Sequence, residues 1–203
     1  MNLVQIGVSV FQQNLYQVKN CIESCLAQEN CLITCRTDGP ESCEADVHNY
    51  LELVASEKKE FKFICGEKRL GNFGSLNTIF NTSELPFLCQ LDADDMLASG
   101  ALRICIENLK SNPGASFLYT DCLEVDDFGT PIKIGGRSLI EYTEVNSLIQ
   151  FIPFHLRLIR RESFDRIGGY DARLKYAGDY DISLKLSEVG ACTLNHSGNL
   201  LLV

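Results

Sequence analysis

Short apolar runs alternate with amphipathic stretches along the first half of the chain. The apolar runs have the length of buried strands and lie at residues 4–11, 31–36, 61–65 and 87–91. Between them, apolar side chains recur every three or four positions, which predicts helices at residues 15–28, 45–56 and 73–81. Strands that alternate with helices favour a parallel sheet built from right-handed βαβ units. We therefore expect an α/β fold with a mostly parallel central sheet flanked by helices.

The second half of the chain is less regular. The same patterns predict helices at residues 98–110, 161–167 and 179–188, and strands at residues 116–122, 154–160 and 199–203. Residues 125–130 form a turn signal before another short strand, which we expect to be antiparallel. Residues 137–150 show no clear period. Because no linker separates the two halves, we expect a single domain over residues 1–203.

The composition narrows the class of protein. The 203 residues are 45% hydrophobic, which is enough for a substantial core, and the net charge of −9 argues against general nucleic-acid binding. The first residues lack the positive charge of a signal peptide, and no window approaches the roughly 18 apolar residues of a membrane span. We expect a cytoplasmic protein without an integral membrane segment, either free or at the cytoplasmic face of the membrane.

Ten cysteines are many for a chain of this length. They do not form the CxxC pairs of zinc ribbons, and most of them interrupt apolar runs. We therefore expect reduced thiols in the core, as in a cytosolic protein.

Three carboxylates follow the fourth predicted strand. Asp92, Asp94 and Asp95 come directly after the apolar run at residues 87–91. Adjacent carboxylates at the end of a buried strand repel one another and lose hydration, so a positive charge should lie beside them. Mn²⁺ and Mg²⁺ prefer such oxygen ligands, and open α/β sheets bind ligands at the carboxyl ends of their strands. The cluster therefore predicts a divalent metal site at this edge of the sheet.

Other polar residues can reach the same edge. Asp38 follows the second predicted strand, and Arg69 and Asn77 flank the loop and helix after the third. Asp179 opens the last long helix. Simpler explanations exist for each: Asp38 can be a plain turn residue and Asp179 a helix N-cap. Arg69 can be a surface charge, and Asn77 a packing amide.

The order of these motifs resembles a family-2 glycosyltransferase of the GT-A fold over nearly the whole chain. The segments that carry the resemblance are Val8-Ser9-Val10, Cys25-Leu26-Ala27-Gln28, Thr37-Asp38-Gly39, Leu91-Asp92-Ala93-Asp94-Asp95, Ile167-Gly168-Gly169-Tyr170-Asp171 and Gly178-Asp179-Tyr180-Asp181. The resemblance implies a Rossmann-like sheet with a small antiparallel element in its second half. It also implies that residues 1–97 bind a nucleotide-sugar and that residues 98–203 form the acceptor and catalytic half.

Roles for individual residues follow from the resemblance. The residues similar to nucleotide-sugar contacts in the family are Asp38, Arg69, Asn77, Asp92 and Asp94. Asp38 matches the acidic residue that reads the base, usually uracil. The Asp92–Asp95 segment matches the DxD motif, in which Asp94 and Asp95 would hold Mn²⁺ or Mg²⁺ against the diphosphate. Asp179 matches the catalytic base.

The implied reaction is an inverting transfer from a nucleotide-diphosphate sugar, most simply a UDP-sugar. The cation would neutralise the leaving diphosphate, and the sugar would pass through an oxocarbenium-like state. Asp179 would take the proton of the acceptor hydroxyl as the new bond forms. The partners are then the donor and a carbohydrate or lipid-linked saccharide acceptor, while the sugar, the acceptor and the oligomeric state stay open.

The chain departs from the family pattern at several positions. Thr37 stands where the family usually has an acidic residue, and Gly178 stands where it usually has Glu. The loop at residues 11–14 lacks the usual Pro-x-Tyr-Asn pattern. A further Tyr-Arg-x-x-His-like segment would begin near Val203, so we expect a truncated domain.

Two other functions compete with the glycosyltransferase. A non-catalytic or degenerate nucleotide-binding domain of a longer transferase would explain the departures. A phosphohydrolase similar to the haloacid dehalogenases also has an Asp-x-Asp motif after an apolar strand, but usually at its start. Among the remaining polar residues, Asp181 is most simply a first-turn charge, and the isolated His155 and His196 are most simply structural or surface residues.

Overall fold

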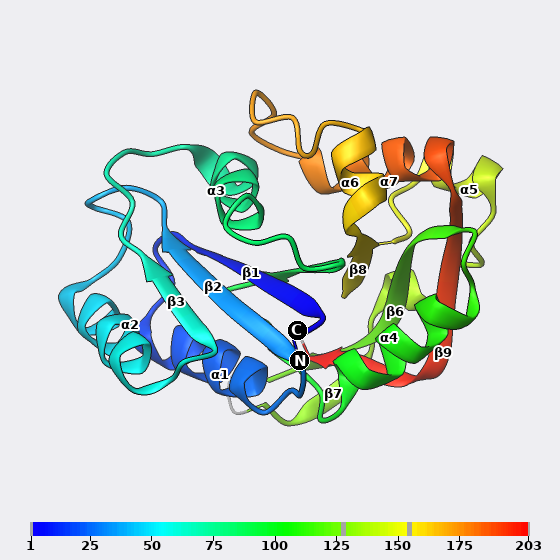
Figure 1. Ribbon diagram of the computed structural model, residues 1–203. Coiled ribbons are helices and arrows are strands. Elements are labelled where there is room, and N and C mark those ends of the chain that lie inside the picture. The colour runs from blue at the N-terminus through cyan, green and yellow to red at the C-terminus, as the bar shows by residue number, and fades with distance from the viewer. Residues whose placement is uncertain (1, 127–128, 154–155, 203) are drawn as a thin grey trace.

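The computed structural model describes residues 2–126, 129–153 and 156–202, and for residues 194–201 it describes the backbone alone. In the first half, strands alternate with helices: β1 (Val4–Val10), α1 (Leu15–Leu26), β2 (Cys31–Thr37), α2 (Ala45–Glu57), β3 (Phe61–Ile64), α3 (Gly71–Phe80) and β4 (Phe87–Asp92). These strands pair in parallel in the order β3-β2-β1-β4 (Figure 1). The parallel sheet predicted from the alternation is confirmed.

The second half continues the same sheet with mixed directions. Its elements are β5 (Met96–Leu97), α4 (Ala101–Ser111), β6 (Ala115–Val125), β7 (Pro131–Ile134), the 3₁₀ helix η1 (Gly136–Leu139), α5 (Glu144–Ile149), β8 (Arg157–Arg160), α6 (Arg161–Arg166), α7 (Gly178–Val189) and β9 (Ala191–Leu202). Strand β8 runs antiparallel to both β4 and β6, whereas β9 runs parallel to β6. The short strands β5 and β7 pair antiparallel with β9 and β6. The small antiparallel element expected in this half is confirmed.

Helices cover both faces of the sheet (Figure 1). On one face, apolar side chains of α1, α2 and α4 form a core with the sheet. On the other face, α3, α6 and α7 pack together around Phe80, Phe164 and Tyr170. Helix α3 lies so close to β1 that a Cβ at Gly7 would come within 2.7 Å of the Phe80 ring. This close packing positions the amino end of α3 beside the strand ends that form the site.

Two predicted strand boundaries in the second half need correction. The last strand was predicted at residues 199–203, but β9 begins at Ala191 because it pairs along β6, a partner that no local pattern reveals. No element was predicted at residues 137–150, where the structure has η1 and α5. Strand β8 begins at Arg157, and residues 154–155, including His155, lie outside the described residues.

The cysteines are free thiols, as expected. Seven are buried: Cys21, Cys25, Cys31, Cys35, Cys89, Cys105 and Cys122. Cys65 is the exposed exception. Within the described residues, we find no helix with the length and apolar character needed to cross a membrane.

Candidate active site at the carboxyl ends of β1, β2 and β4

A cleft of about 860 Å³ opens where β1, β2 and β4 end. Its walls come from the loops after these strands and from the loop between α6 and α7, which reaches towards α3 (Figure 1). The lining residues are Ser9, Phe11, Gln13, Asp38, Arg69, Leu70, Gly71, Asn72, Asp92, Ala93 and Asp94 from the first half, and Ala172, Arg173, Leu174, Lys175 and Tyr176 from the second. The cleft thus brings together four residues singled out in the sequence: Asp38, Arg69, Asp92 and Asp94.

Asp38 is buried, with 3% of its surface exposed. Its Oδ1 accepts hydrogen bonds from the Leu70 amide at 2.7 Å and the Ser75 hydroxyl at 2.9 Å. Oδ1 also accepts from Nη1 of Arg36 at 3.2 Å, and Oδ2 accepts from the Gly71 amide at 3.0 Å. The first amides of a helix have no partner within it, and the helix dipole favours negative charge there. Asp38 therefore ties the end of β2 to the start of α3.

Arg69 forms the neighbouring wall of the cleft. Its guanidinium carbon lies 4.0 Å from the centroid of the Phe11 ring, and its Nε lies 3.9 Å from Oδ2 of Asp38. A cation over an aromatic face is attracted by the ring's electron density. The loop before Arg69 crosses β2 so closely that a Cβ at Gly66 would lie 2.0 Å from the Thr37 carbonyl oxygen. Arg69 is thereby held near Asp38, although most of its side chain is exposed.

The turn after β4 carries the clustered carboxylates. The Asp95 amide donates to the Asp92 carbonyl at 3.1 Å, which closes the turn. Asp92 and Asp94 reach the cleft, whereas Asp95 is half-buried. Burial, reinforced by the charges of Asp92 and Asp94, raises the pKa of Asp95 to about 8. Desolvation also raises the pKa of Asp92, because protein atoms crowd its carboxylate even though the side chain reaches the cleft surface.

A buried cation lies behind these carboxylates. Arg157 in β8 is 4% exposed, and its Nη2 donates to Oε1 of Gln90 at 2.9 Å. Nε2 of Gln90 in turn donates to Oδ1 of Asp92 at 3.2 Å, and the Tyr170 hydroxyl donates to Oε1 of Gln90 at 2.6 Å. Arg157 opposes the rise in the pKa of Asp92. Arg157 is not among the site residues predicted from the sequence, although an arginine inside an apolar run was an available signal.

Asp179 lies in the first turn of α7 and is half-buried. The N-cap of this helix is Ala177, in the left-handed conformation with φ of 58°, so the N-cap explanation of Asp179 is wrong. The charge of Asp179 contributes to the raised pKa of Asp92, which means that the two carboxylates are close enough to interact. Asp181 lies two residues further on, and its Oδ2 is 2.6 Å from Nζ of Lys185, which agrees with a charge in the first turn.

Asn77 lies outside the lining of the cleft. Its Oδ1 accepts from the Tyr170 amide at 3.0 Å, and its Nδ2 donates to the Tyr170 carbonyl at 2.8 Å. Both ends of the amide therefore hold the Gly168-Gly169-Tyr170 turn against α3. These bonds agree with the packing explanation of Asn77, and its contact with a nucleotide-sugar stays a prediction.

The carboxylates of the cleft suit a hard divalent cation that is coordinated by the protein and by a substrate together. Asp92 and Asp94 offer carboxylate oxygens to the cleft, and the raised pKa values of Asp92 and Asp95 indicate a shortage of positive charge. In the part of the chain that the structure describes, no three His, Cys, Asp or Glu side chains converge into a complete metal cage. Mg²⁺ usually binds one or two carboxylates together with substrate phosphates and water, so these residues fit it.

The fold and the cleft define the class of protein. The fold is that of GT-A transferases: the chain superimposes over its whole length on S. aureus TarS 1-349 in complex with UDP-GlcNAc, with a TM-score of 0.79 and 16% identity, covering 58% of that chain. It also superimposes over 99% of its length on the mannosyltransferase PcManGT from Pyrobaculum calidifontis in complex with GDP-Man and Mn²⁺, with a TM-score of 0.75 and 14% identity, covering 56% of that chain. Identities this low establish the fold alone.

Sequence comparison identifies the family. The family described as Glycosyl transferase family 2 matches residues 7–168, and the chain belongs to it. The chain is 28% identical over 189 residues to chondroitin synthase of Escherichia coli, which covers 93% of this chain. It spans only 27% of the length of that relative. Membership of this family argues against the phosphohydrolase alternative.

Proposed function

We propose that the domain transfers a sugar from a nucleotide-diphosphate sugar, most simply a UDP-sugar, to a hydroxyl group of a carbohydrate acceptor, with inversion. The observation that carries this proposal is the single cleft that joins Asp38 and Arg69 to Asp92 and Asp94, with Asp179 within electrostatic reach of Asp92. A polysaccharide or lipid-linked saccharide acceptor is supported by the similarity to a chondroitin synthase.

The two ends of the cleft suit the two ends of a nucleoside diphosphate. Arg69 and Phe11 offer a flat, partly apolar wall for a base, beside the carboxylate of Asp38. Asp92 would contact the ribose and diphosphate, and Asp94 and Asp95 would hold the divalent cation. When bound, Mn²⁺ or Mg²⁺ would neutralise part of the charge that develops on the leaving diphosphate.

Asp179 is the proposed general base. Its carboxylate accepts the proton of the acceptor hydroxyl as that oxygen attacks the anomeric carbon from the face opposite the diphosphate. A single displacement of this kind inverts the configuration at that carbon. Asp181 is a poor alternative because Lys185 already pairs with it. Asn77 has a positioning role in this proposal, through its two hydrogen bonds to Tyr170.

Donor binding can be tested by thermal unfolding. UDP together with Mn²⁺ should raise the unfolding temperature of the wild-type protein more than either alone, because the ligands bind the folded state. Asp94→Asn should lose the effect of Mn²⁺ and keep a small effect of UDP. The absence of any shift at millimolar UDP and Mn²⁺ would overturn the proposal of a UDP donor.

Catalysis can be tested with a matched pair of variants on one helix turn. Asp179→Asn should lower the rate of transfer between about a hundred- and ten-thousandfold, the usual range for a general base, and leave UDP binding unchanged. Asp181→Asn is the control, and its rate should stay within about threefold of the wild type. If the wild-type protein binds UDP but turns over no UDP-sugar, the domain is a non-catalytic nucleotide-binding module.

A further inference from the structure

Three positively charged side chains line the cleft: Arg69, Arg173 and Lys175. Asp92 and Asp94 line the same cleft, so the cleft carries both signs of charge. A cleft that binds an anionic substrate together with a cation needs such a combination. The question is which of the three cations is available to the substrate.

Two of the three are already engaged within the protein. Arg173 forms a double hydrogen bond with Asp171, from Nε to Oδ1 at 2.9 Å and from Nη2 to Oδ2 at 2.7 Å. Arg69 lies over the Phe11 ring, close to the carboxylate of Asp38. Both guanidinium groups therefore have protein partners that compete with a ligand.

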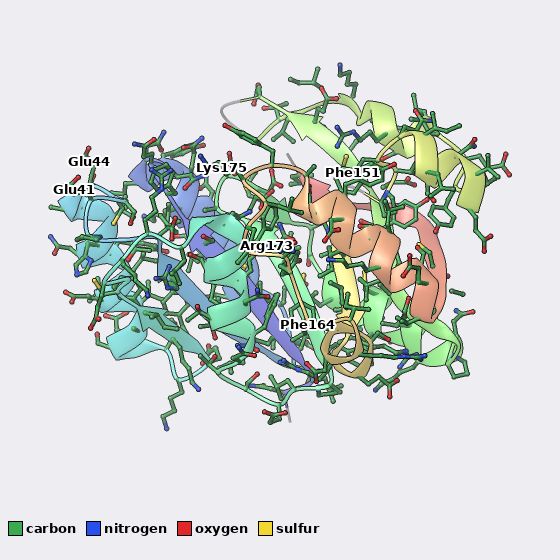
Figure 2. The ribbon with its side chains drawn as sticks, turned by 90° about the horizontal axis from the view of Figure 1, so that it is seen from above. Glu41, Glu44, Phe151, Phe164, Arg173 and Lys175 are labelled. Carbon is green, nitrogen blue, oxygen red and sulfur yellow. The ribbon has the colours of Figure 1, made fainter. Side chains whose placement is uncertain are left out.

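Lys175 differs from both. Its side chain is exposed at the cleft, and it forms no hydrogen bond or ion pair with any residue that the structure describes. Figure 2 shows Lys175 and Arg173 on the loop that crosses from α7 towards the first half of the chain. An ammonium group carries three donors, so an uncommitted lysine in a cleft is suited to a phosphate oxygen.

The loop that carries Lys175 is anchored on both sides. Before it, the Leu174 amide donates to the Asp171 carbonyl at 3.1 Å. After it, Ala177 adopts the left-handed conformation with φ of 58°, which is costly for a residue with a Cβ. Gly178 then packs so tightly that a Cβ would lie 2.5 Å from the Phe73 ring. Lys175 is therefore presented from a defined turn just before Asp179.

We infer that Lys175 binds the diphosphate of the donor and stabilises the leaving group. This inference rests on the proposed function and deepens it. Breaking the glycosidic bond leaves a free nucleoside diphosphate, whose terminal phosphate gains negative charge relative to the sugar-linked form. A cation that meets this charge as it develops lowers the barrier, because it binds the transition state more tightly than the donor. Asp92 would contact the diphosphate, Asp94 and Asp95 would hold the cation, and Lys175 would reach the diphosphate from the loop between α6 and α7.

The experiment compares a nucleoside with its phosphates. The affinities of the wild-type protein for uridine, UMP and UDP are measured by calorimetry with Mn²⁺ present, and the series is repeated for Lys175→Met. The variant should lose about tenfold in affinity for UDP, less for UMP, and nothing for uridine, since a partly exposed ion pair is screened but retains useful Coulomb energy. Lys175→Arg should restore most of the affinity for UDP.

Lys68→Met is the matched control for net charge. Lys68 is exposed in the loop before Arg69 but does not line the cleft, so its removal should change affinity for UDP less than twofold. Unchanged affinity of Lys175→Met for UDP would overturn the inference. An equal loss for uridine and UDP would overturn it too, because the contact would then not be with phosphate.

The same series separates this inference from the proposed function. If the wild-type protein binds none of the three ligands, the proposed function and the role of Lys175 are both overturned. If the wild-type protein and Lys175→Met both bind UDP much more tightly than uridine, only the role of Lys175 is overturned.

Discussion

Strands β2 and β4 flank β1 and both lead into aspartates, but the surroundings of these aspartates differ. Asp38 after β2 is buried and accepts four hydrogen bonds, two of them from backbone amides. Asp92 and Asp95 around the turn after β4 have raised pKa values, because burial and mutual repulsion are only partly offset by Arg157. Four donors thus compensate the charge of Asp38, whereas the pKa values of Asp92 and Asp95 stay raised.

The difference separates two tasks that look the same in the sequence. A carboxylate with enough internal donors holds the backbone in place, and its removal leaves those donors unpaired. Carboxylates without enough positive charge are a cost in the unliganded protein, which a bound cation repays. We therefore interpret Asp38 mainly as the residue that shapes the cleft, and the Asp92–Asp95 turn as the part whose charge a bound ligand compensates.

The largest expected effect concerns the turn after β4. Asp94→Asn should lower the rate of sugar transfer about a thousandfold, since metal-assisted neutralisation of a leaving group contributes several kcal/mol. Its free energy of unfolding without ligand should stay within about 0.5 kcal/mol of the wild type, because the side chain is exposed. Urea unfolding and a transfer assay measure the two quantities. A large loss of stability would mean that Asp94 resembles Asp38, and the comparison would break down.

The second effect concerns Asp38, at the end of β2. Asp38→Ala should lower the free energy of unfolding by about 3 kcal/mol, because Arg36 is buried and would lose a carboxylate partner. The control is Asp46→Ala at the exposed start of α2, where the loss should be below about 1 kcal/mol. A loss at Asp38 as small as that at Asp46 would contradict the structural role.

The smallest effect is a pH dependence of the metal-free protein. The pKa of Asp95 is about 8 in the folded state against 3.8 for an ordinary aspartate, so the folded state holds a proton that the unfolded state has released in between. Stability should therefore fall as the pH rises from about 4 to 8, by roughly 1–2 kcal/mol for this partly exposed group. Asp95→Asn should flatten the dependence, as measured by urea unfolding in the presence of a chelator at pH 5 and pH 8. An unchanged slope would contradict the raised pKa of Asp95.

Local patterns were sufficient for the first half of the fold. The four strands and three helices follow from apolar periodicity, and the parallel direction of the strands follows from their βαβ connections. The position of Asp92, Asp94 and Asp95 at a strand end also follows, because β4 stops where the charges begin. Boundaries shifted by only a few residues, as at the start of α3, which is Gly71 rather than residue 73.

The second half depended on partners that the sequence does not reveal. Strand β9 is extended by its pairing with β6, although its polar residues give no strand period. The side chain of Asn77 is hydrogen-bonded to Tyr170, a residue 93 positions away. Arg157 reaches the carboxylate cluster only because β8 lies antiparallel beside β4.

The sequence by itself determined the family, the alternation of the first sheet and the place of the acidic cluster, because each depends on neighbours along the chain. Only the tertiary structure decided which aspartate is satisfied and which cation is free to bind. The reason is physical: a charge is settled by the donors and ions within a few ångströms, and in this protein most of those come from distant segments. The different surroundings of Asp38, Arg157 and Lys175 arise only when the fold brings β2, β8 and the loop before α7 together.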